Sequence, residues 1–175
     1  PDAGGKEIVN RRIGQNEFDT LATCLAYLQA QREYANGDHD DDQVKEFAQL
    51  LKSKVGYKDG LYWPMSGEAV PSPLGRLLAD ASGKSPKPYH GYFYRILDKQ
   101  GEHAPGGAHN YVINGNMIAG HALVAWPAKY GESGVMTFVV SHHGVIYEKN
   151  LGPKTAETVK TISSFNPDKT WKKVE

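Results

Sequence analysis

The sequence lacks an excess of charge of either sign, because 20 Lys and Arg residues balance 20 Asp and Glu residues. A domain that binds nucleic acid needs surplus positive charge to displace counterions from phosphates, so we expect no nucleic-acid partner. The sequence also lacks any apolar run near the ~18 residues that a membrane-spanning helix requires, and we expect no such segment in this chain. Internal repeats and low-complexity stretches are missing as well, which excludes solenoid architectures.

Cysteine is almost missing too, since the chain contains only Cys24. An intrachain disulfide is therefore excluded. A chain of 175 residues is long enough to bury a core without disulfides or metals, and we expect one domain over residues 1–175. An initiator methionine and a signal peptide are lacking, so we expect a processed form or a fragment, with any export signal upstream.

What the sequence does contain is a long amphipathic pattern near its start. Residues 6–35 are predicted to form one helix, weakened at Gly14 and ended by Asn36-Gly37. Apolar side chains at spacings of three and four residues define the face expected to pack on a sheet. They are Phe18, Leu21, Leu25 and Leu28. Further helices are predicted over residues 41–54, which begin with acidic residues, and over residues 74–81.

From residue 92 onward the apolar pattern changes from helical to strand-like. β-Branched and aromatic residues predict strands at 92–97, 122–126, 135–140 and 145–149. Asn114-Gly115 predicts a small hairpin, and the tail is predicted to hold a helical stretch at 154–163 and an edge strand or coil at 171–174. Helices followed by strands with short turns favour the α+β class. We predict a long N-terminal helix packed on an antiparallel sheet of about four strands, with a second helix and long loops.

Six short segments spread over nearly the whole chain carry a family resemblance. They are Asn-Arg-Arg-Ile-Gly at 10–14, Asp-Gly-Leu-Tyr-Trp-Pro at 59–64, Ser-Pro-Leu-Gly at 72–75, Pro-Tyr-His-Gly-Tyr at 88–92, Ala-Pro-Gly-Gly at 104–107 and Gly-Val-Met-Thr-Phe at 134–138. Together they resemble a bacterial exported family known as domain of unknown function 2950. The resemblance implies a periplasmic or secreted location and a longer precursor of which this chain is the C-terminal part. It implies no activity.

A second resemblance concerns the arrangement of helix and sheet. Residues 28–35 and the strand-forming run 122–128 are similar to segments of type II secretion pseudopilins and other pilin-like proteins. The resemblance implies a long helix packed on an antiparallel sheet. Pilins begin with an apolar half-helix, whereas this chain has Glu7, Asn10, Arg11 and Arg12 there. Since burying these polar groups is costly, we expect no pilin-type filament from this chain.

Several groups of residues suggest a metal site or a nucleophile. Cys24 would act as a nucleophile only beside an activating base, and its apolar helical neighbours favour a small buried hydrophobe. His103, His109 and His121 offer three zinc ligands without a recognised zinc spacing. Residues 38–42 offer carboxylates to calcium but lack the spaced calcium-loop pattern, so a solvated helix start is favoured. We therefore assign neither a cofactor nor a catalytic residue.

A partner or ligand surface is the remaining type of candidate site. Its candidates are the aromatic and histidine side chains Tyr62, Trp63, Tyr89, His90, Tyr92, His142 and His143. Aromatic residues beside prolines line grooves or anchor loops over a core, and both interpretations stay open here. The two adjacent histidines, at 142 and 143, alternatively form a polar hairpin tip.

The sequence favours a non-enzymatic protein of the envelope or the extracellular space. No coherent catalytic set is present, and the pilin-like pattern suggests interaction with other envelope proteins or with a second copy. The alternative is an enzyme or a small-ligand-binding domain that uses the loop histidines and aromatic residues. A deep cleft that gathers His90, His103, His109 or His121 with a carboxylate would favour this alternative.

Overall fold

The computed structural model describes residues 3–64 and 71–175. A 32-residue helix, α1 (Ala3–Tyr34), precedes all the strands. The other helices are α2 (Arg76–Ala79), α3 (Thr155–Thr158) and the 3-10 helix η1 (Val159–Thr161). The strands are β1 (Tyr92–Leu97), β2 (Lys99–Gln100), β3 (His109–Asn110), β4 (Val112–Ile113), β5 (Asn116–Met117), β6 (Ala122–Pro127), β7 (Met136–Ser141), β8 (Ile146–Asn150) and β9 (Lys172–Lys173).

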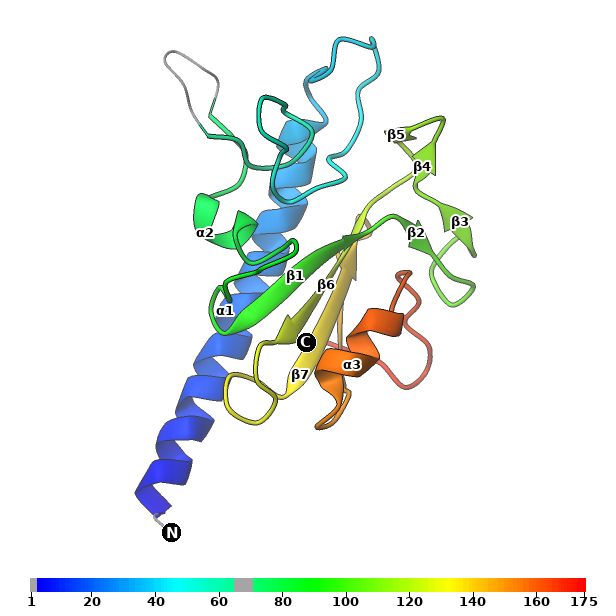
Figure 1. Ribbon diagram of the computed structural model, residues 1–175. Coiled ribbons are helices and arrows are strands. Elements are labelled where there is room, and N and C mark those ends of the chain that lie inside the picture. Colours follow the sequence, from blue (N-terminus) through cyan, green and yellow to red (C-terminus); the bar gives the residue numbers. More distant parts are fainter. Residues whose placement is uncertain (1–2, 65–70) are drawn as a thin grey trace.

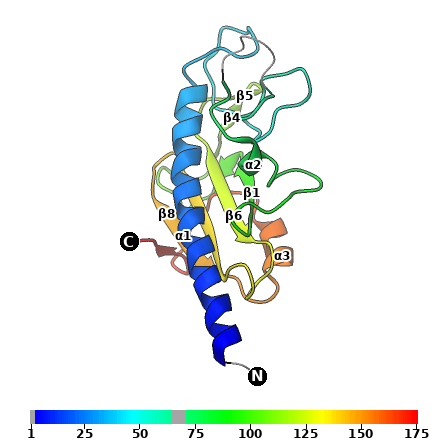
Figure 2. The same ribbon diagram turned by 90° about the vertical axis from the view of Figure 1, so that its left-hand side faces the viewer.

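Five strands form the main sheet, in the order β1-β6-β7-β8-β9 with every pair antiparallel. The α+β prediction is confirmed, with one strand more than expected. Helix α1 crosses one face of the sheet, while α3 lies on the opposite face (Figures 1 and 2). The predicted small hairpin is confirmed as β4 and β5, and the edge strand of the tail as β9.

The central strands are buried on both sides, which explains their continuous apolar runs. In β6, Leu123 and Ala125 belong to the core beneath α1, whereas Ala122 and Val124 belong to the core on the other face. Successive side chains of a strand point to opposite faces, so one apolar run serves both cores.

Helix α1 turns a different face to the sheet than the sequence predicts. Leu28 is buried at 6% exposure, but Phe18 and Leu25 are 68% and 56% exposed. The buried face instead carries Tyr27 and Gln31, which are fully buried and hydrogen-bonded to each other. A hydropathy pattern places polar side chains such as Gln31 in solvent. The predicted sheet-facing stripe is therefore wrong at Phe18 and Leu25. The helix also continues through Gly14 without a break.

The prediction of a helix over residues 41–54 is wrong, because the structure has no helix there. Asp41 and Gln43 have φ angles of 62° and 68°, outside the right-handed helical region. The segment extends along its neighbours instead, with the Phe47 amide donating to the Met117 carbonyl over 2.8 Å and the Leu50 carbonyl accepting from Leu61 over 2.9 Å. These tertiary hydrogen bonds replace the helical ones.

Candidate functional site

The predicted aromatic and histidine candidates do not form one surface. Trp63 and Tyr92 are buried in the core beneath α1, so neither side chain is available to a partner. Tyr62 is half-buried against the same core. His142 and His143 lie at the end of β7, far along the sheet from the remaining pair, Tyr89 and His90.

Tyr89 and His90 line a groove between α1 and α2 with a volume of about 660 Å³. From α1 the groove receives mainly small and acidic side chains, and from α2 it receives Leu77 and Arg76. Leu77 is 69% exposed on the rim. The groove therefore combines apolar walls with the carboxylates of Asp19 and Glu33.

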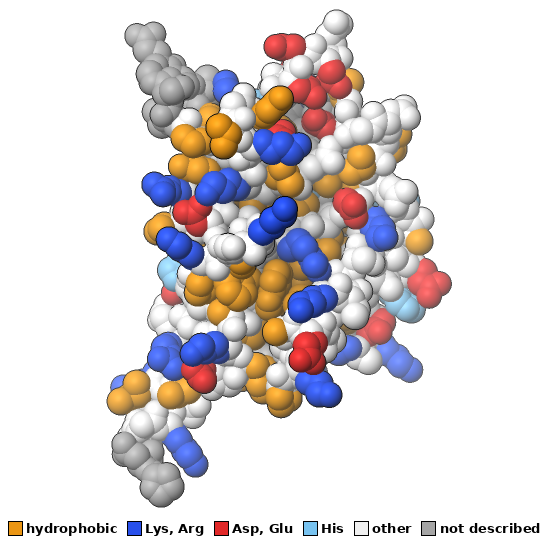
Figure 3. Space-filling model, viewed as in Figure 1, with side chains coloured by type: hydrophobic (Ala, Val, Ile, Leu, Met, Phe, Trp, Pro, Cys, Tyr) orange, Lys and Arg blue, Asp and Glu red, His pale blue; other side chains and the backbone are white. Residues whose placement is uncertain are grey.

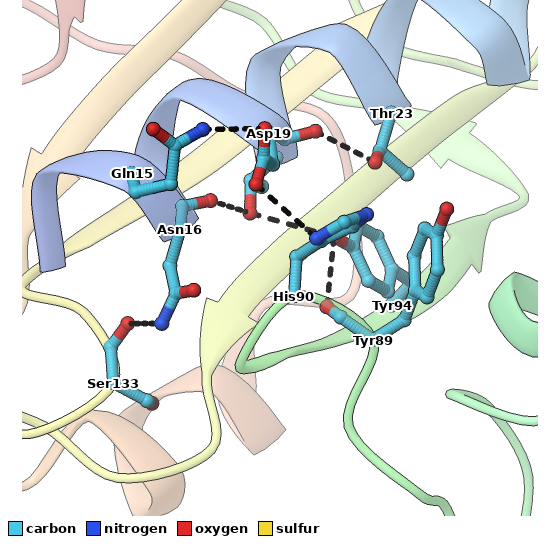
Figure 4. A network of polar contacts seen from close by, with 9 residues as sticks. Gln15, Asn16, Asp19, Thr23, Tyr89, His90, Tyr94 and Ser133 are labelled. Carbon is cyan, nitrogen blue, oxygen red and sulfur yellow. Dashed lines mark hydrogen bonds and ion pairs between the residues drawn. The ribbon is translucent and has the colours of Figure 1, made fainter. Parts of the chain in front are cut away.

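His90 enters this groove because of a tight turn. Tyr89 and Tyr92 exchange both backbone hydrogen bonds, at 2.9 and 3.0 Å, which leaves His90 and Gly91 as a two-residue loop. Their φ angles are 50° and 74°, as a type I′ turn requires. The turn directs the His90 ring toward α1, where Nδ1 lies 3.2 Å from Oδ2 of Asp19 (Figure 4).

Asp19 is held in place by its own helix. Gln15 donates from Nε2 to Oδ1 of Asp19 over 2.9 Å, which leaves the second oxygen for His90. The nearby Thr23 hydroxyl donates to the Asp19 backbone carbonyl over 2.8 Å and is thus occupied within the helix (Figure 4). An activated hydroxyl nucleophile would need a hydrogen bond to the imidazole instead. The Asp19–His90 pair acts as a link between α1 and the start of β1.

Further contacts fix α1 on the loop before β7, and the sequence contained no signal for them. One carboxylate oxygen of Glu17 accepts the backbone N–H groups of Val135 and Met136 at 2.8 and 2.9 Å. One residue earlier, the Asn16 side-chain amide donates to the Ser133 carbonyl over 2.8 Å (Figure 4). These polar residues are structural anchors that hold the groove-lining face of α1 at a fixed angle to the sheet.

The histidines proposed as zinc ligands are not brought together as a set. His121 is buried, and its Nδ1 lies 3.2 Å from the Tyr27 hydroxyl. His109 is exposed and packs edge-on against Tyr111. The Nε2 atom of His103 lies 3.8 Å from Glu102 instead. Within residues 3–64 and 71–175, no group of three or more potential metal ligands within 4.8 Å of one another includes a histidine.

Burial governs the chemistry of both His121 and Cys24. Desolvation lowers the pKa of His121 to about 3, helped by the nearby His142 and Arg32. The hydroxyl of Tyr27 donates to the Ala122 carbonyl, so its lone pairs accept from Gln31 and from a neutral His121. Desolvation likewise raises the pKa of the Cys24 thiol to about 12, which opposes thiolate chemistry.

The acidic segment 38–42 does gather carboxylates, because Asp38, Asp40 and Asp42 form a group within 4.8 Å. All three residues are exposed. Asp38 accepts the amides of Asp41 and Gln43, and Asp42 accepts from Val44. The carboxylates thus stabilise the turn that replaces the predicted helix.

A long helix anchored across an antiparallel sheet, with a groove between α1 and α2, defines an α+β protein without a recognisable catalytic centre in its described residues. The chain belongs to the family DUF2950, described as a protein of unknown function, which matches residues 1–174. Neither a curated protein nor a solved structure matches this chain. Among the described residues, no helix has the length and apolar character to cross a membrane.

Proposed function

We propose that this domain is an envelope or secreted protein that acts by binding another protein through the outer face of α1 and the adjoining groove. One observation carries the proposal: the large apolar side chains Phe18 and Leu25 point to solvent on this face, at 68% and 56% exposure. They lie two helical turns apart, and therefore on one stripe, with Ala22 between them. Contiguous apolar patches that are exposed to solvent commonly mark sites of protein–protein interaction.

The groove extends this stripe toward α2. Ala22 and Ala26 line the groove, and the exposed Leu77 lies on its opposite rim. A partner that covered the stripe would thus also fill the groove and approach the Asp19–His90 pair. Buried aromatic and aliphatic anchors with a polar rim are typical of protein interfaces. Helix α1 lies across an antiparallel sheet, which is the arrangement that the pilin-like resemblance implies, but no solved structure matches this chain (Figure 2).

The alternative of a small-ligand or catalytic site is favoured by the Asp19–His90 pair alone. The groove contains one histidine, and the other histidines lie elsewhere. Protein binding at the stripe accounts for both the exposed apolar residues and the groove, so we prefer it.

The test is quantitative capture from a native envelope or culture-supernatant extract. The immobilised domain is compared with a Phe18→Ser/Leu25→Ser variant and with Ile113→Ser, which removes an exposed apolar residue on β4. We expect a partner that the Ile113 variant retains and the double variant loses, while circular dichroism shows all three folded. Equal capture by all three would refute the proposed surface.

A further inference from the structure

Strand β1 is an edge strand, and most of its free edge is covered. Tyr92 exchanges backbone hydrogen bonds with Tyr89, and the Tyr94 amide donates to the Ala81 carbonyl over 3.1 Å. Farther along, the Asp98 carbonyl accepts from the Tyr111 amide over 2.8 Å. Such coverage is how proteins protect an edge from unwanted pairing.

A short window of this edge is open. The amides of Tyr92 and Tyr94 point away from β6. Because backbone groups alternate in direction along an antiparallel strand, the amide and the carbonyl of Ile96 also point away from β6. On the side of β1 that faces away from β6, the described parts of the chain make no backbone hydrogen bond to the Tyr94 carbonyl, the Ile96 amide or the Ile96 carbonyl. Tyr94 is 1% exposed, so the groups available to an added strand are the N–H and C=O of the half-buried Ile96.

A groove of about 600 Å³ runs beside this window. Its walls are residues 49–54 on one side and β1 with residues 81–86 on the other, and its apolar lining includes Leu50, Ile96 and Trp126. A neighbouring hollow of about 340 Å³ shares Leu50 and Ile96 and so continues the groove along β1. An occupant of this groove lies between β1 and residues 49–54, which suits a single extended segment.

The charge around the groove selects the kind of segment. Arg95 lines the groove and Lys160 lines its continuation, where Asp98 is the acidic residue. Lys52 and Lys54 also line the groove, and each is paired with a carboxylate, of Asp80 and Asp59 respectively. Figure 3 shows this face, with hydrophobic side chains over β1 surrounded by Lys and Arg. Arg95 is also held by the Val159 and Ile162 carbonyls, at 2.9 and 2.7 Å. The charges of Arg95 and Lys160 therefore complement negative charge on a bound chain, and the paired lysines add hydrogen-bond donors to this basic rim.

We propose that the groove beside β1 binds an extended acidic peptide segment of another protein, which pairs with the edge of β1 at Ile96. Main-chain hydrogen bonds to the open window supply orientation. Apolar side chains of the segment alternate into the groove against Leu50 and Trp126, and its acidic side chains face the basic rim. This surface lies apart from the outer face of α1, so it stands or falls independently of the proposed function.

The probe is a fluorescein-labelled octapeptide of alternating valine and glutamate, titrated against the full chain by fluorescence anisotropy. The controls are the valine–lysine peptide and a valine–glutamate peptide with N-methylated backbone amides. We expect saturable binding of the first peptide only. In ¹⁵N spectra, the Ile96 amide should shift and exchange more slowly with solvent.

Two variants examine the two contributions separately. Ile96→Pro removes the outward N–H while leaving the β6 ladder, because proline is tolerated where the amide faces out of an edge strand. It should weaken binding by about tenfold, corresponding to a single lost hydrogen bond and added steric hindrance. Lys54→Glu, at a 73% exposed side chain, should weaken binding less, and only at low salt. Phe18→Ser should bind as the wild type does.

Absence of saturable binding at millimolar peptide would overturn the proposal. So would equal binding of the lysine or N-methylated peptide, because neither charge nor main-chain pairing would then be involved. If Ile96→Pro fails to fold, the N-methylated peptide and the Ile96 amide shift decide the question.

Discussion

Acidification should destabilise this fold through His121. The imidazole is 2% exposed, and burial together with His142 and Arg32 lowers its pKa from 6.5 to about 3. Between these two values the unfolded chain binds a proton at this position and the folded chain does not. Stability is therefore fully present above pH 6.5 and falls as the pH drops toward 3.

The displaced pKa implies a loss of about 2 kcal/mol from this one site between pH 7.5 and pH 5. The pKa of His142 is also lowered, chiefly by burial, so this residue adds to the loss in the same direction. Urea unfolding followed by tryptophan fluorescence at the two pH values measures the total change.

A matched variant isolates the His121 contribution. His121→Asn keeps a donor near the position of Nδ1 for the Tyr27 hydroxyl but does not titrate. Its change in unfolding free energy between the two pH values should be smaller than that of the wild type by about 2 kcal/mol. The control is His103→Asn, at an exposed position, which should behave as the wild type. An identical pH dependence in His121→Asn and the wild type would refute the reasoning.

Four further predictions concern burial and packing. Leu28→Ala should cost about 2–5 kcal/mol in urea unfolding, whereas Leu25→Ala, at an exposed position, should cost well under 1 kcal/mol. Equal losses of unfolding free energy in the two variants would show that Leu25 is buried and that the orientation of α1 is wrong. The thiol of Cys24 should resist a thiol-specific reagent in the native protein and react once urea unfolds it. Gly14→Ala should stabilise by about 1 kcal/mol, because its Cβ meets open space within α1. Gly134→Ala should destabilise, because its Cβ would lie 2.1 Å from a buried hydroxyl.

The strands and the length of α1 follow from local patterns in the sequence. β7 is rich in β-branched and aromatic residues, β6 is a continuous apolar run, and the next strand in the sheet follows each of them closely in the sequence, so few alternatives compete. The orientation of α1 is different, because it depends on which polar groups find partners. Gln31 is buried because its side chain exchanges two hydrogen bonds with the backbone of Ala48, which no helical periodicity reveals.

The candidate site was predictable only in part. A histidine before glycine between two tyrosines suggests a turn, and His90 was identified as a candidate on this segment. Its partner Asp19 was not, because the two lie on elements whose packing angle is set by distant contacts such as those of Glu17. The open window at Ile96 likewise depends on which loops cover the rest of β1.

The docking of α1 has a consequence for how the protein is made. The helix packs on β6 and β7, so its partners leave the ribosome about 100 residues after it does. At ~5–20 residues per second, this delay lasts about 5–20 seconds. Throughout that interval Tyr27 and Leu28 have no sheet to cover them, and the amides that Glu17 accepts do not yet exist. The docking of α1 therefore has to wait for the sheet, which makes α1 the segment most in need of a holding chaperone during synthesis.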